Sequence, residues 1–235
     1  MSLLAPTVIK LLAFFLVIFT TTIFGQIERK KNPVDFLPKG YVVFEKINGD
    51  LNKDGIEDCV LIIKATDKNQ IITDEYRGLL DQNRRGIIVL LNKNESYELI
   101  LKNYNCFSSE NEDGGVYFAP ELSVEIKNEK LYIHYGHGRY GYWKYTFRFL
   151  NSDFELIGYD TAYRSNFDSD YVTFDEESIN FLSKKKLIKE VIKVNTDGKE
   201  TYKETWYNLI LKGFIKLSEI KDFEEIEIEQ ILNEK

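Results

Sequence analysis

The sequence predicts an all-β protein with one or two short helices, and three observations lead to this prediction. The chain of 235 residues contains 15 Tyr and 16 Phe, and aromatic side chains favour the pleated, half-buried surface of a sheet. Apolar and polar residues alternate over many short segments, as in strands with one buried and one solvated face. Short links rich in Asn, Asp, Gly and Ser separate the segments and suit hairpin turns. We expect a mostly antiparallel meander, either propeller-like or a sandwich.

The first 25 residues have the pattern of a secretory signal peptide. They carry one charge, Lys10, which is followed by the apolar run of residues 11–19 and by a small residue, Gly25. The run is short for a membrane span of about 20 residues, so a cleaved signal is favoured over an uncleaved anchor. We expect a mature chain that begins at Gln26, is secreted or periplasmic, and has no membrane attachment after cleavage.

Strands are predicted along the mature chain from two kinds of pattern. Residues 59–64 and 86–91 are continuous apolar runs, which are typical of strands covered on both faces. Alternating patterns, which predict strands with one wet face, cover residues 98–102, 122–127, 131–135, 142–150 and 154–159.

Helical periodicity is confined to two segments. Tyr76, Leu79 and Leu80 stand at i, i+3 and i+4 and predict a helix within residues 73–83, and the tail at 218–232 has a weaker pattern of the same kind. The Ser-, Asn- and Asp-rich segment 161–175 is either a domain boundary or a long loop. We expect a β-meander domain at 26–160, with C-terminal hairpins and a tail at 161–235 packed on the same domain.

The most specific motif is the acidic loop, residues 50–58, with the sequence Asp-Leu-Asn-Lys-Asp-Gly-Ile-Glu-Asp. Ca²⁺ takes about six to eight oxygen ligands, and a loop that turns at a glycine can gather them from alternate positions. The predicted metal ligands are Asp50, Asn52, Asp54, the Ile56 carbonyl and Asp58. The alternative interpretation is a solvated turn between two strands. An EF-hand is excluded, because it needs flanking helices and a Glu where this chain has Leu61.

With strands predicted on both sides, residues 41–65 resemble the calcium-binding hairpin loop of integrin-type FG-GAP and VCBS repeats, whose form is D-x-N-x-D-G-x-x-D. The resemblance implies one Ca²⁺ ion held between two strands. A propeller needs several such repeats, and the sequence has a single good copy. Residues 114–159 look like segments of exported bacterial proteins without an assigned activity, and this likeness implies no mechanism.

Residues 132–143 contain both histidines of the chain, His134 and His137, together with three glycines and five aromatic residues. This segment is a structural hairpin, an exposed binding surface, or a metal or catalytic site. Aromatic rings beside a guanidinium suit a planar ligand or a sugar ring. We therefore expect any protein or carbohydrate ligand to bind at Arg139, Tyr140, Tyr142 and Trp143.

Cysteines and charge set further limits on function. Cys59 and Cys106 either form a structural disulfide or stay as buried thiols. The basic run 184–186 is expected to be a solvated turn. A net charge of −7 argues against binding to nucleic acid, whose affinity for proteins comes from Lys and Arg at its phosphates.

Taken together, these observations predict a calcium-stabilised exported β-protein with a binding or accessory role, and not an enzyme. Two alternatives stay open. One is an exported hydrolase that uses the acids of residues 110–113 with His134 or His137. The other is a protein inhibitor or immunity partner that presents an exposed patch at residues 139–143.

Overall fold

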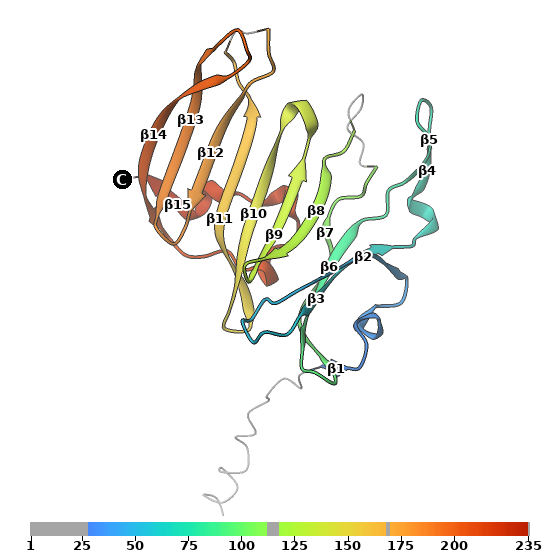
Figure 1. The fold of residues 1–235 in the computed structure, drawn as a ribbon. Helices are drawn as coiled ribbons and strands as arrows, with labels where there is room; N and C mark the ends of the chain where they lie inside the picture. The colour runs from blue at the N-terminus through green and yellow to red at the C-terminus, as the bar shows by residue number, and fades with distance from the viewer. Residues whose placement is uncertain (1–27, 112–117, 168–169, 235) are drawn as a thin grey trace, which may run out of the picture.

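The computed structural model describes residues 28–111, 118–167 and 170–234, and these form an all-β fold of three antiparallel sheets with short 3-10 helices (Figure 1). The predicted fold class is confirmed. The predicted signal peptide and the expected start at Gln26 lie outside the described residues. No helix in the described ranges is long and apolar enough to cross a membrane.

The first sheet has five strands in the order β1-β7-β6-β3-β2. Its strands are β1 (Arg29–Lys30), β2 (Tyr41–Gly49), β3 (Asp58–Ala65), β6 (Arg85–Asn92) and β7 (Tyr97–Phe107). The central strands β3 and β6 are buried along their apolar runs, as their sequences predict. One face of this sheet packs on Phe36 of the 3-10 helix η1 (Pro33–Phe36), and the opposite face packs on the second sheet.

The second sheet is an eight-stranded meander in which each strand pairs with its neighbours in sequence. Its strands are β8 (Glu121–Lys127), β9 (Lys130–Gly136), β10 (Gly141–Leu150), β11 (Asp153–Arg164), β12 (Phe174–Asn180), β13 (Lys185–Val194), β14 (Glu200–Leu211) and β15 (Leu232–Glu234). Strands β11 and β12, which flank the Ser-, Asn- and Asp-rich segment, pair with each other in this sheet.

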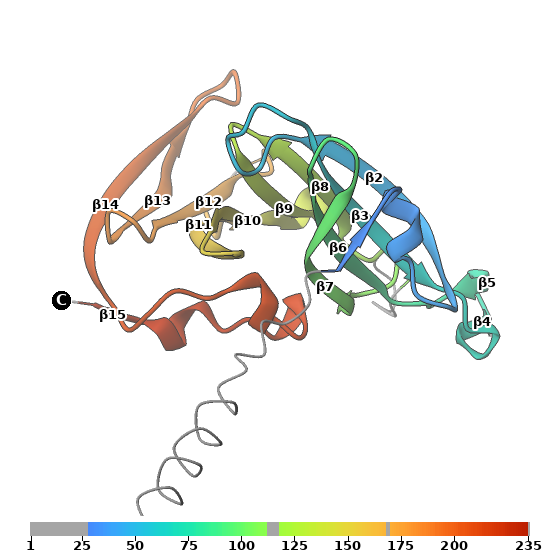
Figure 2. The same ribbon diagram turned by 90° about the horizontal axis from the view of Figure 1, so that it is seen from below.

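The main core lies where both sheets meet the C-terminal segment. That segment contains η4 (Leu217–Glu219), η5 (Phe223–Glu225) and η6 (Ile228–Ile231), and Figure 2 shows it in red, running below the strands toward the five-stranded sheet. The Phe223 ring lies 4.9 Å from the Phe107 ring of β7 and 5.2 Å from the Tyr145 ring of β10. One apolar cluster therefore joins all three parts.

The helix predicted within residues 73–83 is wrong, because this segment is a hairpin of β4 (Ile71–Asp74) and β5 (Gly78–Asp81), preceded by η2 (Lys68–Gln70). The Asp74 side chain accepts hydrogen bonds from the backbone N–H groups of Tyr76 and Arg77, at 2.9 and 2.7 Å. Gly78 has φ of 78°, which glycine adopts without strain. These local contacts favour a turn over a helix.

Two smaller expectations also need correction. The tail at 218–232 forms short 3-10 helices separated by extended residues, and not one longer helix. In the basic run 184–186, Lys184 has the positive φ of a turn, but Lys186 is buried and pairs with Glu177 at 3.0 Å. The run is therefore only partly solvated.

Candidate functional site

The acidic loop joins β2 to β3 and is organised by the side chain of its first residue. Asp50 Oδ1 accepts hydrogen bonds from the backbone N–H groups of Asn52, at 3.1 Å, and Lys53, at 2.6 Å. Its other oxygen, Oδ2, accepts one from the Gly55 N–H at 3.0 Å. The chain turns back on Asp50 because Lys53 and Gly55 have φ of 68° and 80°.

The next two polar side chains of the loop repeat this arrangement. Asn52 Oδ1 accepts a hydrogen bond from the Asp54 N–H, and Asp54 Oδ1 accepts one from the Ile56 N–H, each at 2.9 Å. The Asn52 amide also donates to Asp54 Oδ2 at 3.0 Å. The loop thus holds its side-chain oxygens toward its own backbone.

Asp58 closes the loop and is fully buried. Its Oδ2 accepts a hydrogen bond from the Leu51 N–H, and its Oδ1 accepts one from the Asn92 N–H at the end of β6, each at 2.9 Å. Burial raises the pKa of Asp58, the two hydrogen bonds oppose this, and the nearby Asp54 and Asp50 raise it further. A nearby cation would offset the cost of the buried charge.

The Asn92 side chain lies against the end of the acidic loop. Its amide nitrogen donates to the Glu57 carbonyl at 3.0 Å, while its Oδ1 is buried and accepts no hydrogen bond from the described residues. A buried polar atom without a partner costs about 1–3 kcal/mol. A water molecule or a cation at this point would remove the cost, and this fits an ion at the base of the loop.

The base of the acidic loop touches the second sheet. A Cβ atom added at Gly49 would lie 2.5 Å from Cγ2 of Ile126 on β8, so only glycine fits there without a shift. In the described ranges, no three His, Cys, Asp or Glu side chains form a group arranged to hold a metal ion. To bind Ca²⁺, the loop carboxylates have to use lone pairs beyond those that accept backbone N–H groups.

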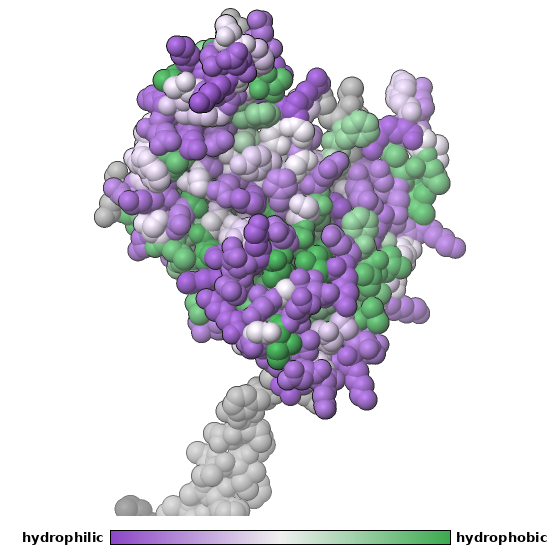
Figure 3. Space-filling view, in the orientation of Figure 1, coloured by the Kyte–Doolittle hydropathy of each residue, from purple (hydrophilic) through white to green (hydrophobic). Residues whose placement is uncertain are grey.

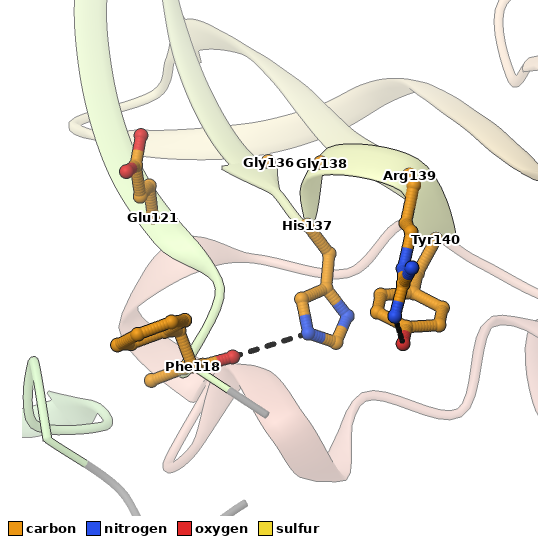
Figure 4. Close-up of a pocket in the computed structure, with 8 residues that line it drawn as sticks. Phe118, Glu121, Gly136, His137, Gly138, Arg139 and Tyr140 are labelled. Atoms are coloured by element: carbon orange, nitrogen blue, oxygen red, sulfur yellow. Dashed lines mark hydrogen bonds between the residues drawn. The ribbon is translucent and has the colours of Figure 1, made fainter. Parts of the chain in front are cut away.

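A second candidate site is a cavity of about 510 Å³, which we call the hairpin cavity (Figure 4). A nitrogen of the His137 ring lies 3.2 Å from the Phe118 carbonyl oxygen. Arg139 donates to the Tyr140 hydroxyl at 2.9 Å, and the Tyr140 ring lies 5.0 Å from the His137 ring. The lining residues come from the start of β8 and the β9–β10 link: Phe118, Ala119, Glu121, Gly136, His137, Gly138, Arg139 and Tyr140.

The four residues expected to bind a protein or carbohydrate lie in different places in the structure. Arg139 and Tyr140 line the hairpin cavity. Tyr142 lies on the opposite side of β10 from Trp143, whose ring stacks on Tyr135 at 5.2 Å and packs against the core. These four side chains therefore do not form one surface.

The histidines and acids proposed for a hydrolase also do not come together at one site. His137 lines the hairpin cavity, whereas His134 lines a different cavity, with its Nδ1 atom 3.5 Å from Ser123 Oγ. Glu110 pairs with Lys64 at 2.9 Å, and Lys64 pairs equally closely with Asp81. The other acids of that loop, at positions 112 and 113, lie outside the described residues.

Both cysteines are buried free thiols. Cys59 on β3 belongs to the cluster around Phe36, and Cys106 on β7 belongs to the main core on the opposite face of the five-stranded sheet. Burial raises the pKa of Cys59 to about 11 and raises that of Cys106 as well. The disulfide alternative is wrong for this structure.

Three groups near these sites were not found by sequence reasoning: Asn92 beside the acidic loop, and Ser123 and Lys144 around His134. The pairing register of neighbouring strands places each of these residues at its site. Register produces no local pattern in the sequence from which they could be predicted. Comparison with known proteins gave no match to a family model, a curated protein or a solved structure.

Proposed function

We propose that this chain is an exported, calcium-stabilised β-protein with a binding or accessory role. The observation that carries the proposal is the base of the acidic loop, where Asp58 is a buried carboxylate and Asn92, whose backbone N–H it binds, has a buried side-chain oxygen without a partner in the described residues. The proposed ligands are Asp50, Asn52, Asp54, the Ile56 carbonyl and Asp58. Calcium would offset the net negative charge of this turn.

Asp58 gives the ion a structural effect beyond its own loop. The carboxylate connects Leu51 of the acidic loop to Asn92 of β6, two strands away from β2 in the sheet. An ion that binds only the folded protein stabilises it by RT ln(1 + [L]/Kd). We infer that calcium holds one end of the five-stranded sheet together.

The test is thermal unfolding of the exported protein in Ca²⁺ and in chelator. Intact mass first establishes whether residues 1–25 are missing from that protein. With free Ca²⁺ at about 100 times Kd, we expect a gain of about 2.7 kcal/mol in the free energy of unfolding. Mg²⁺ should give less, because it keeps its waters and demands a stricter octahedron.

Two variants separate calcium binding from general charge effects. Asp54→Ala should remove most of the calcium gain without unfolding the protein, because Asp54 is exposed. Glu57→Ala removes an equal charge from the same loop but no proposed ligand, and it should keep the gain. Equal stability of the wild type in millimolar Ca²⁺ and in chelator would show that the loop is only an acidic turn.

The binding role is proposed for the hairpin cavity. Phe118 at this cavity is 82% exposed, and an aromatic ring beside a cation and a carboxylate suits a peptide or a sugar. Arg139 and Glu121 supply opposite charges there. His137, His134 and Glu110 lie at three different sites. This separation favours a binding role over a catalytic one.

A further inference from the structure

The outer face of the eight-stranded sheet, opposite the main core, carries an ordered set of polar side chains over β8, β9 and β10. Alternate residues of neighbouring strands stand directly opposite one another there. Figure 3 shows hydrophilic residues, in purple, over much of this side of the molecule, with white and green residues among them. The nine residues form three rows, which we call the outer grid: Ser123, His134 and Lys144; Glu125, Tyr132 and Thr146; Lys127, Lys130 and Arg148.

The third row of the outer grid places three cations side by side. Like charges directly opposite on neighbouring strands destabilise a sheet. Arg148 is balanced by Glu155 at 3.0 Å, but Lys127 and Lys130 form no ion pair within the described ranges. In a chain of net charge −7, two adjacent unbalanced lysines form a local site that attracts an anion.

A cavity of about 380 Å³ lies over this grid, within the range of small-molecule sites. It combines cations, a carboxylate, hydroxyl groups and an aromatic ring on one sheet face. The lining residues are Ser123, Glu125, Lys127, Asn128, Tyr132, His134 and Lys144. All of these residues except Asn128, which lies in the β8–β9 turn, are on strands, so the backbone under the cavity is rigid.

Lys144 and His134 are themselves positioned by neighbours. The Lys144 ammonium lies 3.0 Å from Asp160, whose other oxygen accepts a hydrogen bond from Ser178 at 2.6 Å. The His134 ring lies 5.4 Å from the Tyr142 ring. Burial and the nearby Lys144 lower the pKa of His134, which favours the neutral ring.

We propose that the cavity over the outer grid binds a sugar that carries an acidic group, whether carboxylate, sulfate or phosphate. Lys127 would hold the acidic group, with Lys130 beside it on the neighbouring strand. Glu125, Ser123 and neutral His134 offer acceptors and donors to sugar hydroxyls, and Tyr132 offers a ring face. This site is independent of the calcium proposal and of the hairpin cavity.

A nucleic acid fits this surface less well than an acidic sugar. Its phosphates form a continuous line of charge, and affinity for them rises with the number of cations that meet them. Here Glu125, Glu155 and Asp160 stand among the cations, and they would repel such a line. An acidic sugar, with one acidic group among several hydroxyls, fits this surface of mixed charges better.

The experiment is a titration of the full mature protein, followed by the NMR signal of the His134 ring and by calorimetry. The probes are glucuronic acid, glucose 6-phosphate and glucose 6-sulfate, with glucose, inorganic phosphate and a single-stranded oligonucleotide for comparison. We expect at least one acidic sugar to bind about tenfold more tightly than both glucose and phosphate. A bound anion should also raise the pKa of His134.

Lys127→Gln should weaken binding of that sugar by about tenfold, and Lys203→Gln should leave it unchanged. Lys203 is an exposed lysine of the same sheet that pairs with Glu190 at 3.0 Å, so it controls for net charge. Because Lys127 is exposed, its replacement should leave the melting temperature near that of the wild type.

Four results would overturn the proposal. They are tighter binding of the oligonucleotide than of any sugar, equal binding of phosphate and the acidic sugars, no binding of any acidic sugar, and an unchanged affinity in Lys127→Gln.

Discussion

At the scale of a single residue, the two cysteines show how side chains alternate between the faces of a strand. The face to which each cysteine points decides whether its thiol can react. Cys59 and Cys106 point to opposite faces of the five-stranded sheet, and neither is exposed. The thiolate is the reactive form, and burial raises the pKa of both thiols. These two side chains are therefore packing groups and not reactive ones.

We expect a thiol reagent to find almost no reactive thiol in the native protein at pH 8. In denaturant without reductant, the same reagent should find two thiols per chain. Absorbance of the released reagent measures both values. A denatured, unreduced chain with no free thiol would contradict the structure, since it would mean that the cysteines are bonded.

Two glycines of the β9–β10 link allow a matched comparison. Gly141 has φ of 110°, and a Cβ atom there would lie 1.9 Å from the Ala162 carbonyl oxygen. Gly138 also has a positive φ, of 52°, but a Cβ atom there would meet nothing within 4 Å. Backbone conformation affects both positions, and crowding affects only one.

Gly138→Ala should lower the free energy of unfolding by about 1–2 kcal/mol, the usual cost of a left-handed residue with a side chain. Gly141→Ala should cost at least about 1–3 kcal/mol more, because φ of 110° with ψ of −153° is open almost only to glycine and the new side chain also overpacks against β11. Urea unfolding measures both. Equal losses in the two variants would show that the Ala162 contact relaxes without cost.

At the scale of the element, local pattern and distant contacts explain which predictions succeed. The apolar runs of β3 and β6 were predicted as strands covered on both faces, and both are. The helix at 73–83 was predicted from the spacing of Tyr76, Leu79 and Leu80, but the same spacing fits a hairpin that turns at Gly78. Periodicity over so few residues does not distinguish the two.

The candidate sites were predictable only where their residues lie close together in the sequence. Alternating acids and the glycine of the acidic loop lie within nine residues, so its proposed ligands are visible in the sequence. Asn92 comes from another strand, and the outer grid depends on the register of β8, β9 and β10. A single sequence does not specify register, because partner strands are chosen by the whole fold.

At the scale of the whole molecule, the C-terminal segment joins the two larger sheets. Phe223 is 2% exposed, and besides Phe107 and Tyr145 its ring has Phe147 within 6.3 Å. Since one side chain contacts both sheets, they should lose their structure together.

Phe223→Ala should lower the free energy of unfolding by about 3–5 kcal/mol, because it leaves a cavity at the junction. Phe214→Ala is the control, since Phe214 is in the same segment but 37% exposed, and its loss should be smaller. Calorimetry gives both values. Two separate unfolding transitions in the wild type would contradict the shared core.

The order of the sheets along the chain also affects how the protein is made. All strands of the five-stranded sheet precede the first strand of the eight-stranded sheet, and the segment with Phe223 follows nearly all of the latter. A nascent chain grows from its N-terminus, so the first sheet can pair while the face with Val60 and Val89 still lacks its cover. During that interval the incomplete chain exposes apolar surface to solvent, so it is more prone to aggregate than the finished protein.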